Sequence, residues 1–383
     1  MILKRVRAKK IKDSRGEPTI EVSVNWRKSS APAGKSKGAY ETSPYMNSLD
    51  WNIKSINTTD FSELDVNSFD DLKLIENFIK NKLNLKDAKQ FGANSLFALE
   101  CATLKALAYE SKKQLWEIIN PKAKNLPVPV GNAVGGGVHS NNESRPTIQE
   151  FLIIPQKETI KENYKIMRDT HKEIKKILNA KSQNDEGAWE TSREAEEILE
   201  ILDDKFSDIK IGMDVAASSF YKERKYCYKN QILTEKFQII YINSLIKRFD
   251  LFYVEDPLEE KDFEGFSNIY SSPNHLVVGD DLTATQIDRL KKAISKKSIN
   301  AMIIKPNQNG SLLELKEIFE ICRRNNIKTI LSHRSGETLD SALADLAFGF
   351  QADFIKCGIA TKWREVKLKR LCEIERSLKK RRA

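Results

Sequence analysis

The sequence predicts an α/β protein, in which a small N-terminal α+β domain precedes a larger barrel of parallel strands and helices. The main observation is a series of six short apolar runs between residues 209 and 356, each of which stops at a polar or charged group. Their last residues lie 41, 25, 25, 28 and 23 positions apart, and they are Asp214, Glu255, Asp280, Lys305, His333 and Lys356. Runs of this length, separated by helix-period segments, are typical of repeated strand–helix units. Because such a barrel carries its chemistry at the carboxyl ends of its strands, we expect these six side chains to meet in one site.

The length and the composition agree with two domains. A chain of 383 residues can hold a barrel of roughly 250 residues and a smaller domain. Apolar residues make up 40% of the chain and charged residues 31%, which is typical of a soluble globular protein. Residues 120–127 contain two prolines and no apolar period, so they indicate the boundary. We therefore expect domains at 1–125 and 126–383.

The N-terminal domain is expected to begin with a hairpin. Residues 2–10 and 19–24 have strand character, and the turn residues at 13–18 favour an antiparallel pair. Residues 31–38 form a loop of small residues with two lysines, which composition alone leaves as a flexible connector, and residues 42–70 are polar and weakly patterned. Two apolar stripes then predict helices: Leu72, Ile75, Phe78, Ile79 and Leu83 form the first, and Phe97, Cys101, Leu104 and Ala108 form the second.

The second domain is expected to open with two further strands, at 128–134 and 148–154, on either side of a glycine triplet at 135–137. Two of the four histidines are interpreted as structural. His171 shares a helical stripe with apolar residues, which indicates a packing role. His275 lies at the mouth of a strand and receives the same interpretation.

The charge, the cysteines and the apolar stretches limit the partners and the compartment that we expect for this protein. The formal net charge is +10, but acidic and basic residues are mixed and only 379–382 form a basic run, so we expect no nucleic-acid partner. The five cysteines are odd in number and form no C-x-x-C pair, which favours reduced thiols in a cytoplasm. No apolar stretch approaches the roughly 18 residues of a membrane span, and residues 1–6 lack a signal-peptide core. We therefore expect a cytoplasmic protein with no membrane partner.

Several motifs, taken together, resemble the enolase (phosphopyruvate hydratase) family. The most specific are Ser332-His-Arg-Ser-Gly-Glu-Thr338 and Lys305-Pro-Asn-Gln308. The others are Asp13-Ser-Arg-Gly-Glu-Pro-Thr19, Gly34-Lys-Ser-Lys-Gly38, Gly92-Ala-Asn94, Leu126-Pro-Val-Pro129, Gln149-Glu-Phe151, Asp185-Glu-Gly187, Lys210-Ile-Gly-Met-Asp214, Glu255-Asp-Pro257, Asp280-Asp-Leu-Thr283, and Ile355-Lys356 with Gly358. The resemblance runs from residue 2 to about residue 375 and is broken mainly at 42–70.

This resemblance implies both a fold and an activity. The fold is a small α+β domain followed by an enolase-type (β/α)8-like barrel, whose first units are atypical and whose remaining units are regular. The activity is the reversible, Mg²⁺-dependent dehydration of 2-phospho-D-glycerate to phosphoenolpyruvate. The resemblance also implies a homodimer and two Mg²⁺ ions in each active site.

Carboxylates at three successive strand ends suit Mg²⁺, which prefers oxygen ligands. The residues alone leave open whether these carboxylates bind metal or form salt bridges with Lys305 or Lys356. The resemblance favours metal ligation, and it adds a residue of the 31–38 loop that would bind a second Mg²⁺ together with the substrate phosphate. The expected ligands are Asp214, Glu255, Asp280 and Ser36.

The resemblance makes Lys305 the general base that removes the C2 proton. A lysine can do this only if its pKa falls towards neutrality, and we expect burial beside divalent cations and Lys356 to lower the pKa of Lys305. Glu186 is expected to protonate the leaving 3-hydroxyl, although by itself it would be interpreted as a solvated loop charge. A second nearby carboxylate would raise the pKa of such an acid. Glu150 is expected to hold the hydroxyl or a water.

The remaining polar residues are expected to bind the substrate. Arg334 and Ser335 suit the phosphate, because a guanidinium forks onto two phosphate oxygens. Lys356 would pair with the substrate carboxylate, and His139 and His333 would contact the substrate or order the loops. The expected catalytic set is Glu186, Lys305, Glu150, His139 and His333, and the expected substrate-binding set is His139, Glu150, Lys305, Arg334, Ser335 and Lys356.

Some positions depart from the family pattern, and two alternatives are weighed. The departures are Ala33, Lys35 and Lys37 in the loop, Gly135 where asparagine is usual, and Ala188 and Trp189, which crowd the loop of the acid. We expect them to alter loop closure and rate more than reaction type. An acid-sugar dehydratase would share the three carboxylates but lack the phosphate motif at 332–335. A non-catalytic binding protein on the same fold would be free to lose Lys305 or Glu186, and both are present.

Overall fold

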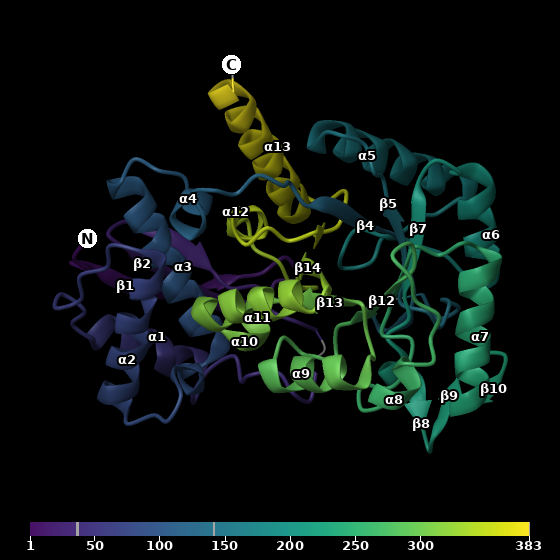
Figure 1. The fold of residues 1–383 in the computed structure, drawn as a ribbon, viewed down its shortest axis with the longest axis horizontal. Helices are drawn as coiled ribbons and strands as arrows, with labels where there is room; N and C mark the ends of the chain where they lie inside the picture. Colours follow the sequence, from purple (N-terminus) through teal and green to yellow (C-terminus); the bar gives the residue numbers. More distant parts are fainter. Residues whose placement is uncertain (36–37, 141, 383) are drawn as a thin grey trace.

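The computed structural model describes residues 1–35, 38–140 and 142–382, and for His139 and residues 381–382 it describes only the backbone. An N-terminal part, in which helices surround a small sheet, packs against a barrel (Figure 1). The C-terminal helix projects from the side of the barrel (Figure 1). The order along the chain, a small α+β part followed by a barrel, agrees with the sequence prediction.

The N-terminal sheet confirms the predicted hairpin. It contains β1 (Val6–Lys12), β2 (Pro18–Val24) and β3 (Arg27–Ser30) in that order, and both pairings are antiparallel. Ile20, Val22 and Val24 are buried and alternate with more exposed residues, because successive side chains of a strand point to opposite faces. The short β3 was not among the predicted elements.

Four α-helices accompany this sheet: α1 (Leu49–Thr58), α2 (Leu72–Leu83), α3 (Ala93–Glu110) and α4 (Leu115–Ile119). Helix α1 lies in the segment that was expected to be weakly patterned. It begins where the hydroxyl of Ser48 accepts a hydrogen bond of 3.0 Å from the backbone N–H of Trp51, an N-cap. Helix α3 buries nearly all its residues and not one stripe alone, because it contacts both the sheet and the barrel-side helix α10 (Pro306–Asn309).

The barrel contains eight strands: β4 (Val128–Gly135), β5 (Glu150–Ile154), β7 (Lys210–Asp214), β11 (Tyr253–Glu255), β12 (Leu276–Gly279), β13 (Ala301–Ile304), β14 (Lys328–Ser332) and β15 (Phe354–Lys356). It closes because β15 pairs with β4 in parallel, with Phe354 opposite Val128. Strand β5 is antiparallel to both β4 and β7, and the other barrel pairings are parallel. The atypical first units and the regular later units are therefore confirmed. The two-residue β6 (Trp189–Glu190) pairs with β4 from outside the closed ring.

The six predicted runs form consecutive strands of this barrel from β7 to β15. Asp214, Glu255 and Lys356 are the last residues of their strands, while Asp280, Lys305 and His333 each follow the last residue of β12, β13 or β14. Apolar side chains that include Val130, Leu152, Val278, Ile303 and Ile330 form a separate buried cluster. Since alternate residues of the strands point inwards, this cluster fills the interior below the charged strand ends.

Helices follow most of the strands. They are α5 (Ile160–Ile177), α6 (Ala195–Lys205), α7 (Glu235–Arg248), α8 (Phe263–Phe266), α9 (Ile287–Lys296), α11 (Leu312–Arg324), α12 (Ala342–Gly349) and α13 (Lys362–Arg382). Across the described ranges, none of the helices is both long enough and apolar enough to cross a membrane. The ring of His275 lies 3.0 Å from the carbonyl oxygen of Leu251, as expected for a structural residue.

Buried polar contacts join the N-terminal part to the barrel. The carboxylate of Glu100, in α3, accepts a hydrogen bond of 2.7 Å from the N–H of Leu312, the first residue of α11. Lys105 pairs with Asp340 at 2.6 Å. We retain the division at 125/126 as a proposal, because these contacts describe the packing of the two parts and not their independent folding.

Candidate active site

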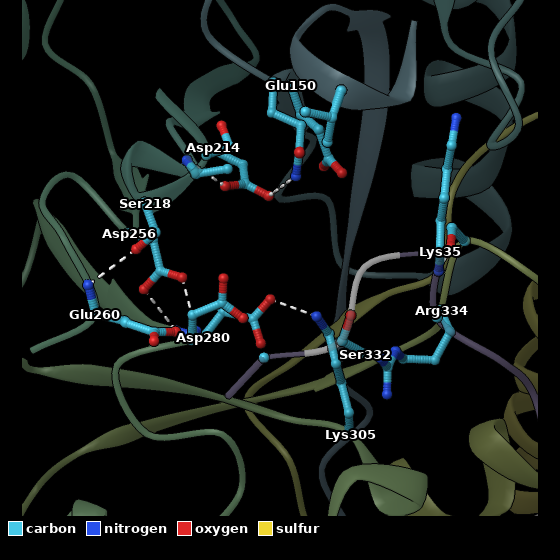
Figure 2. A pocket seen from close by; sticks show the side chains of 18 of the residues that line it. Lys35, Glu150, Asp214, Ser218, Asp256, Glu260, Asp280, Lys305, Ser332 and Arg334 are labelled. Carbon is cyan, nitrogen blue, oxygen red and sulfur yellow. Dashed lines mark hydrogen bonds and ion pairs between the residues drawn. The ribbon is translucent and has the colours of Figure 1, made fainter. Parts of the chain in front are cut away.

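A cavity of about 430 Å³ opens at the carboxyl ends of the barrel strands. Among the described residues, nine acidic side chains line it, together with four lysine or arginine side chains, which are Lys35, Lys305, Arg334 and Lys356. Figure 2 shows Lys305 and Asp280 pointing towards each other in this cavity, while Glu150 and Asp214 lie along another wall. The excess of carboxylates means that an anionic ligand could bind here only with added positive charge.

Lys356 forms the centre of a buried charge cluster. Its ammonium nitrogen lies 3.0 Å from Oε2 of Glu150, 3.0 Å from Oδ2 of Asp214 and 2.8 Å from Oε2 of Glu255. Burial alone would lower the pKa of Lys356, but the three carboxylates outweigh it and raise that pKa well above its usual range. The hydroxyl of Tyr253 donates a further hydrogen bond of 2.5 Å to Glu255.

The carboxylates of this cluster are not all ionised at neutral pH. Burial raises the pKa of Glu255 to about 8, and the charge of Asp214 adds to this rise while Lys356 opposes it. Burial also raises the pKa of Glu150 well above its usual range, and the nearby Glu186 contributes. One ammonium cannot balance three buried carboxylates, so protons compensate part of the excess charge.

Lys305 is paired with Asp280, and this contact corrects one expectation. Burial lowers the pKa of Lys305, but the charge of Asp280 outweighs it, so the net shift is upward and not towards neutrality. Arg334 is the cation that opposes this rise, and not the expected Lys356, whose ammonium is held by three other carboxylates. The same ion pair lowers the pKa of Asp280 even though burial raises it. The salt bridges that the sequence left open as an alternative are present, since Lys305 pairs with Asp280 and Lys356 pairs with Asp214 and Glu255.

Asp256 organises the turn that presents Asp280. Its two carboxylate oxygens accept hydrogen bonds from the backbone N–H groups of Asp280, at 3.0 Å, and Asp281, at 2.7 Å. Among the described residues, Asp256, Asp280 and Asp281 form a group whose ligand atoms all lie within 4.8 Å of one another. Of these three residues, only Asp280 belongs to the predicted ligand set. The other two predicted carboxylates that are described, those of Asp214 and Glu255, contact the ammonium of Lys356 instead.

Two buried oxygens of the predicted ligands have no hydrogen-bond partner among the described residues. They are Oε1 of Glu255 and Oδ1 of Asp280. A buried carboxylate oxygen without a donor costs about 1–3 kcal/mol. A hard divalent cation such as Mg²⁺ binds carboxylate oxygens, so the donor set and these two atoms fit that ion.

Glu186 and His333 face each other at a second place in the cavity. Oε2 of Glu186 lies 3.7 Å from Nε2 of His333 and accepts a hydrogen bond of 3.2 Å from Asn132. Burial lowers the pKa of His333 well below its usual range, although the charge of Glu186 opposes this, so the imidazole is neutral. A neutral imidazole beside a carboxyl group can exchange a proton with it.

Arg334 and Ser335 lie where the 31–38 loop meets the barrel. Both terminal nitrogens of Arg334 donate to the carboxylate of Glu41 at 2.9 Å, in a forked pair. The hydroxyl of Ser335 accepts a hydrogen bond of 2.7 Å from the backbone N–H of Lys35. A guanidinium holds phosphate through the same forked geometry that Arg334 forms with Glu41. The carboxylate of Glu41 therefore lies where Arg334 could hold an anionic group of a ligand.

Some predicted residues cannot be placed. Ser36 and Lys37 lie outside the described residues, and so does the side chain of His139, whose backbone ends the 3-10 turn at Gly137–His139. The remaining predicted residues line the cavity, except Glu255, which is buried just beside it and contacts Lys356. Glu41, Asp256 and Asp281 were missed, although Asp256 and Asp281 directly follow predicted ligands in motifs of consecutive acids.

The fold and this site together define a class of protein. The cavity at the carboxyl ends of the barrel strands is lined by lysines, carboxylates and a neutral histidine. These groups can remove and add protons, as in a lyase that uses acid–base catalysis.

Comparisons with known proteins identify the family. The model described as "Enolase, N-terminal domain" matches residues 3–119, and that described as "Enolase, C-terminal TIM barrel domain" matches residues 123–382. The enolase of Methanosphaera stadtmanae is 35% identical, over 98% of this chain and 97% of that protein. The enolases of Archaeoglobus fulgidus and Thermoplasma acidophilum are each 34% identical, over at least 98% of both chains. The chain belongs to the enolase family, whose members are carbon–oxygen lyases of the phosphopyruvate hydratase type.

Proposed function

We propose that this protein catalyses the reversible dehydration of 2-phospho-D-glycerate to phosphoenolpyruvate, a step of glycolysis and gluconeogenesis, with two Mg²⁺ ions. The observation that carries the proposal is that one cavity holds both a lysine beside Asp280 and a glutamate beside a neutral histidine. The reaction needs both kinds of group, because a proton leaves C2 and another must reach the departing oxygen at C3.

Asp214, Glu255 and Asp280 are the proposed ligands of one Mg²⁺, and Ser36 is the proposed ligand of the second. Support comes from the two buried oxygens without a donor, on Glu255 and Asp280, and from the excess of carboxylates in the cavity. When bound, Mg²⁺ would supply positive charge that stabilises negative charge on the substrate carboxylate and that compensates the charge of Asp280.

Lys305 is the proposed base. It can accept the C2 proton only as a free amine, and the charge of Asp280 now holds its pKa above the usual value. Once the charge of Asp280 is compensated, burial and the neighbouring Arg334 would lower the pKa of Lys305. The electron pair of the C2–H bond is then held on the substrate carboxylate as an enolate, and it forms the C2–C3 double bond in a second step, when the C3–O bond breaks.

Glu186 is the proposed acid for the leaving hydroxyl, with Glu150 and His333 as its neighbours. The proton on Glu186 would pass to the oxygen that leaves C3, and the product is water. The charge of Glu186 already affects the pKa of both Glu150 and His333, so the three groups share one electrostatic environment. His139 is proposed to contact the substrate on the same side.

Arg334, Ser335 and Lys356 are proposed to bind the anionic groups of the substrate. The forked contact of Arg334 with Glu41 supports this, because phosphate can take the place of a carboxylate on a guanidinium. Lys356 is proposed to pair with the substrate carboxylate, since its ammonium lies at the cavity beside Asp214 and Glu255, which are residues that would hold Mg²⁺.

Proton exchange at C2 separates the roles of base and acid. The variant Lys305→Ala should lose exchange of the C2 proton with deuterated solvent, and Glu186→Gln should retain this exchange while losing phosphoenolpyruvate formation. The exchange is measured by NMR of 2-phosphoglycerate. Loss of exchange in Glu186→Gln together with normal exchange in Lys305→Ala would reverse the two roles, and unchanged dehydration in both variants would refute the site.

We also propose, from family membership, a homodimer located in the cytoplasm. Sedimentation equilibrium should give twice the mass of one chain, and a mass of one chain at micromolar concentration would refute the dimer. Cell fractionation should recover the protein with soluble cytoplasmic enzymes.

A further inference from the structure

The loop that carries Glu186 is a tight hairpin between residues 182 and 190. Its backbone is closed by hydrogen bonds from the N–H of Asn184 to the oxygen of Ala188, at 2.9 Å, and from the N–H of Glu190 to the oxygen of Ser182, at 3.1 Å. At its tip, the N–H of Gly187 donates to the oxygen of Asn184 at 2.9 Å. Gly187 has a φ of +85°, which a glycine adopts without strain.

The side chain of Asn184 fills the inside of this hairpin. Its Oδ1 accepts two hydrogen bonds of 3.0 Å, one from the backbone N–H of Glu186 and one from that of Ala188. Asn184 is only 7% exposed, and its Nδ2 has no hydrogen-bond partner among the described residues. The oxygen of one amide therefore holds the backbone of the hairpin at two points, at Glu186 and at Ala188, on either side of Gly187.

Gly135 leaves the space that this amide occupies. A Cβ atom at residue 135, the last residue of β4, would lie 2.4 Å from Nδ2 and 3.0 Å from Cγ of Asn184. Any side chain at residue 135 would therefore displace Asn184. Gly135 is one of the positions that depart from the family pattern, and its lack of a side chain leaves the space that the Asn184 amide fills.

The outer side of the hairpin is held independently. Nε2 of His171 lies 2.8 Å from the carbonyl oxygen of Gly187. The indole N–H of Trp189 donates to the oxygen of His171 at 2.8 Å, and the two rings stack with centroids 5.0 Å apart. Trp189 thus packs on α5 and does not crowd the Glu186 carboxyl. Because these contacts do not involve the side chain of Asn184, they should keep the hairpin in place without it.

We propose that Asn184 is a positioning residue for Glu186, and that Gly135 is required because it leaves room for the Asn184 amide. The inference rests on the proposed role of Glu186 as the acid. Without the two hydrogen bonds the carboxyl group can move relative to the leaving hydroxyl, and a displacement of about 1 Å costs on the order of 100-fold in rate.

The test compares two rates in each variant, which are C2 proton exchange and phosphoenolpyruvate formation. Asn184→Ala should lower phosphoenolpyruvate formation by roughly 10- to 100-fold, while C2 exchange, which depends on Lys305, stays within about twofold. Asn184→Asp keeps an acceptor oxygen and should retain most of the dehydration rate. Equal losses in both rates in Asn184→Ala would overturn the proposal, because a general distortion of the site would cause them.

A double variant tests the contact with Gly135. Gly135→Ala should reduce dehydration selectively, because the methyl group displaces the amide. Gly135→Ala combined with Asn184→Ala should be no worse than Asn184→Ala alone, since the clash no longer exists. Fully additive losses would show that Gly135 acts through another contact and would contradict the second half of the proposal.

A matched control and a parallel variant separate the possible failures. Asn163 is also buried and lies away from the cavity. Its Oδ1 accepts a hydrogen bond from the backbone N–H of Lys157, and its Nδ2 donates one to the backbone oxygen of Lys157. Asn163→Ala should lower the melting temperature without a selective loss of dehydration. If Glu186→Gln still dehydrates, the proposed acid is wrong. If Glu186→Gln behaves as proposed but Asn184→Ala dehydrates at the full rate, the inference about Asn184 alone is wrong.

Discussion

Two groups of buried carboxylates in this protein have similar burial and different partners. In the cavity, Glu150, Asp214 and Glu255 surround the ammonium of Lys356. At the junction of the N-terminal part and the barrel, Glu100 caps the start of α11, and Glu76 accepts a hydrogen bond of 2.5 Å from Ser311. Burial and the charge of Glu76 raise the pKa of Glu100 well above its usual range.

The difference shows that burial and a shifted pKa do not by themselves make a catalytic group. Glu100 uses its carboxyl group to join two helices, and it does not line the cavity. The carboxylates around Lys356 share one ammonium and adjoin an open cavity. The carboxylates around Lys356 can exchange their partner for a metal ion or a substrate, because they adjoin the cavity. Glu100 has only a structural role, because it links two helices away from the cavity.

The largest effect is expected for the central cation of the cavity. The variant Lys356→Met leaves three carboxylates without their ammonium, and breaking such a buried pair typically costs about 3–5 kcal/mol of stability. We expect phosphoenolpyruvate formation to fall by at least about 100- to 1000-fold, as when one preorganised charged group is removed from an active site. Urea unfolding and the rate under saturating Mg²⁺ check both effects.

The control for this variant is Lys105→Met. Lys105 pairs with Asp340 at the junction, outside the cavity. It should lower stability while the rate per folded molecule stays within about threefold, as expected for a change remote from the chemistry. A rate in Lys356→Met as high as that of the control would remove Lys356 from the site.

The next effect concerns the reactivity of Lys305. Asp280→Asn removes the charge that raises the pKa of Lys305, so burial and Arg334 should lower this pKa. Each unit of decrease gives about tenfold more free amine at a fixed pH. An amine-directed reagent, applied in a chelator and followed by peptide mass spectrometry, should label Lys305 at least about tenfold faster at pH 8 in the variant.

Lys356 provides the internal reference in the same labelled samples. Its raised pKa depends chiefly on Asp214, Glu150 and Glu255, so its labelling should not change in Asp280→Asn. Equal acceleration of both lysines would indicate a general opening of the cavity. Unchanged labelling of Lys305 would show that Asp280 does not control its proton.

At the junction, the expected effect is on stability as a function of pH. The folded-state pKa of Glu100 lies above its unfolded value, so its contribution is fully present below the unfolded pKa and is lost as pH rises towards the folded pKa. The neutral variant Glu100→Gln should lack this loss. Its stability relative to the natural protein should therefore rise with pH, by up to about 1.4 kcal/mol per unit in this window.

Urea midpoints at pH 5.5 and pH 8 measure this difference. Glu317→Gln, at an exposed position of α11, the helix whose start Glu100 caps, is the control and should follow the natural protein at both values. Parallel pH profiles for Glu100→Gln and the natural protein would mean that Glu100 is ionised in the folded state. The dehydration rate of Glu100→Gln should remain unchanged, which distinguishes the two carboxylate groups.

The smallest effect is expected for an exposed ion pair at the cavity mouth. Lys35 lies 3.6 Å from Asp185, and its side chain is 40% exposed. Such pairs contribute about 0–1 kcal/mol and weaken with salt. Lys35→Ala should change KM by less than about fivefold, and the change should decrease when the ionic strength is raised. A larger or salt-independent change would place Lys35 in contact with the substrate.

The strand ends could be predicted because they combine two strong local signals, namely a short apolar run and a charge that terminates it. These two signals place Asp214, Glu255 and Lys356 at one end of the barrel without any information on tertiary contacts. The resemblance implied only that the first units of the barrel are atypical. The reversed direction of β5 was not predicted, since apolar runs carry no information on strand direction. Helix α1 was missed because its apolar period is weak, and the Ser48 cap was the available signal.

The partners of the site residues could not be predicted in the same way. Lys305 was expected to have a pKa lowered by burial, by divalent cations and by Lys356. The neighbour that faces it is Asp280, whose charge raises this pKa, and apolar runs in the sequence do not reveal such a pairing. The fork of Glu41 on Arg334 joins residues 293 positions apart and leaves no periodic trace. The complementarity of Gly135 and Asn184 depends on a gap of atomic size that only coordinates reveal.

The most direct test of the central claim is the formation of phosphoenolpyruvate from 2-phosphoglycerate, followed by ultraviolet absorbance, in a chelator and after addition of Mg²⁺. We expect no product in the chelator and full recovery of product formation with excess Mg²⁺. Product formation at the full rate in the chelator would contradict the assignment of the carboxylates at these strand ends to a metal site. No product under either condition would contradict the proposed reaction itself.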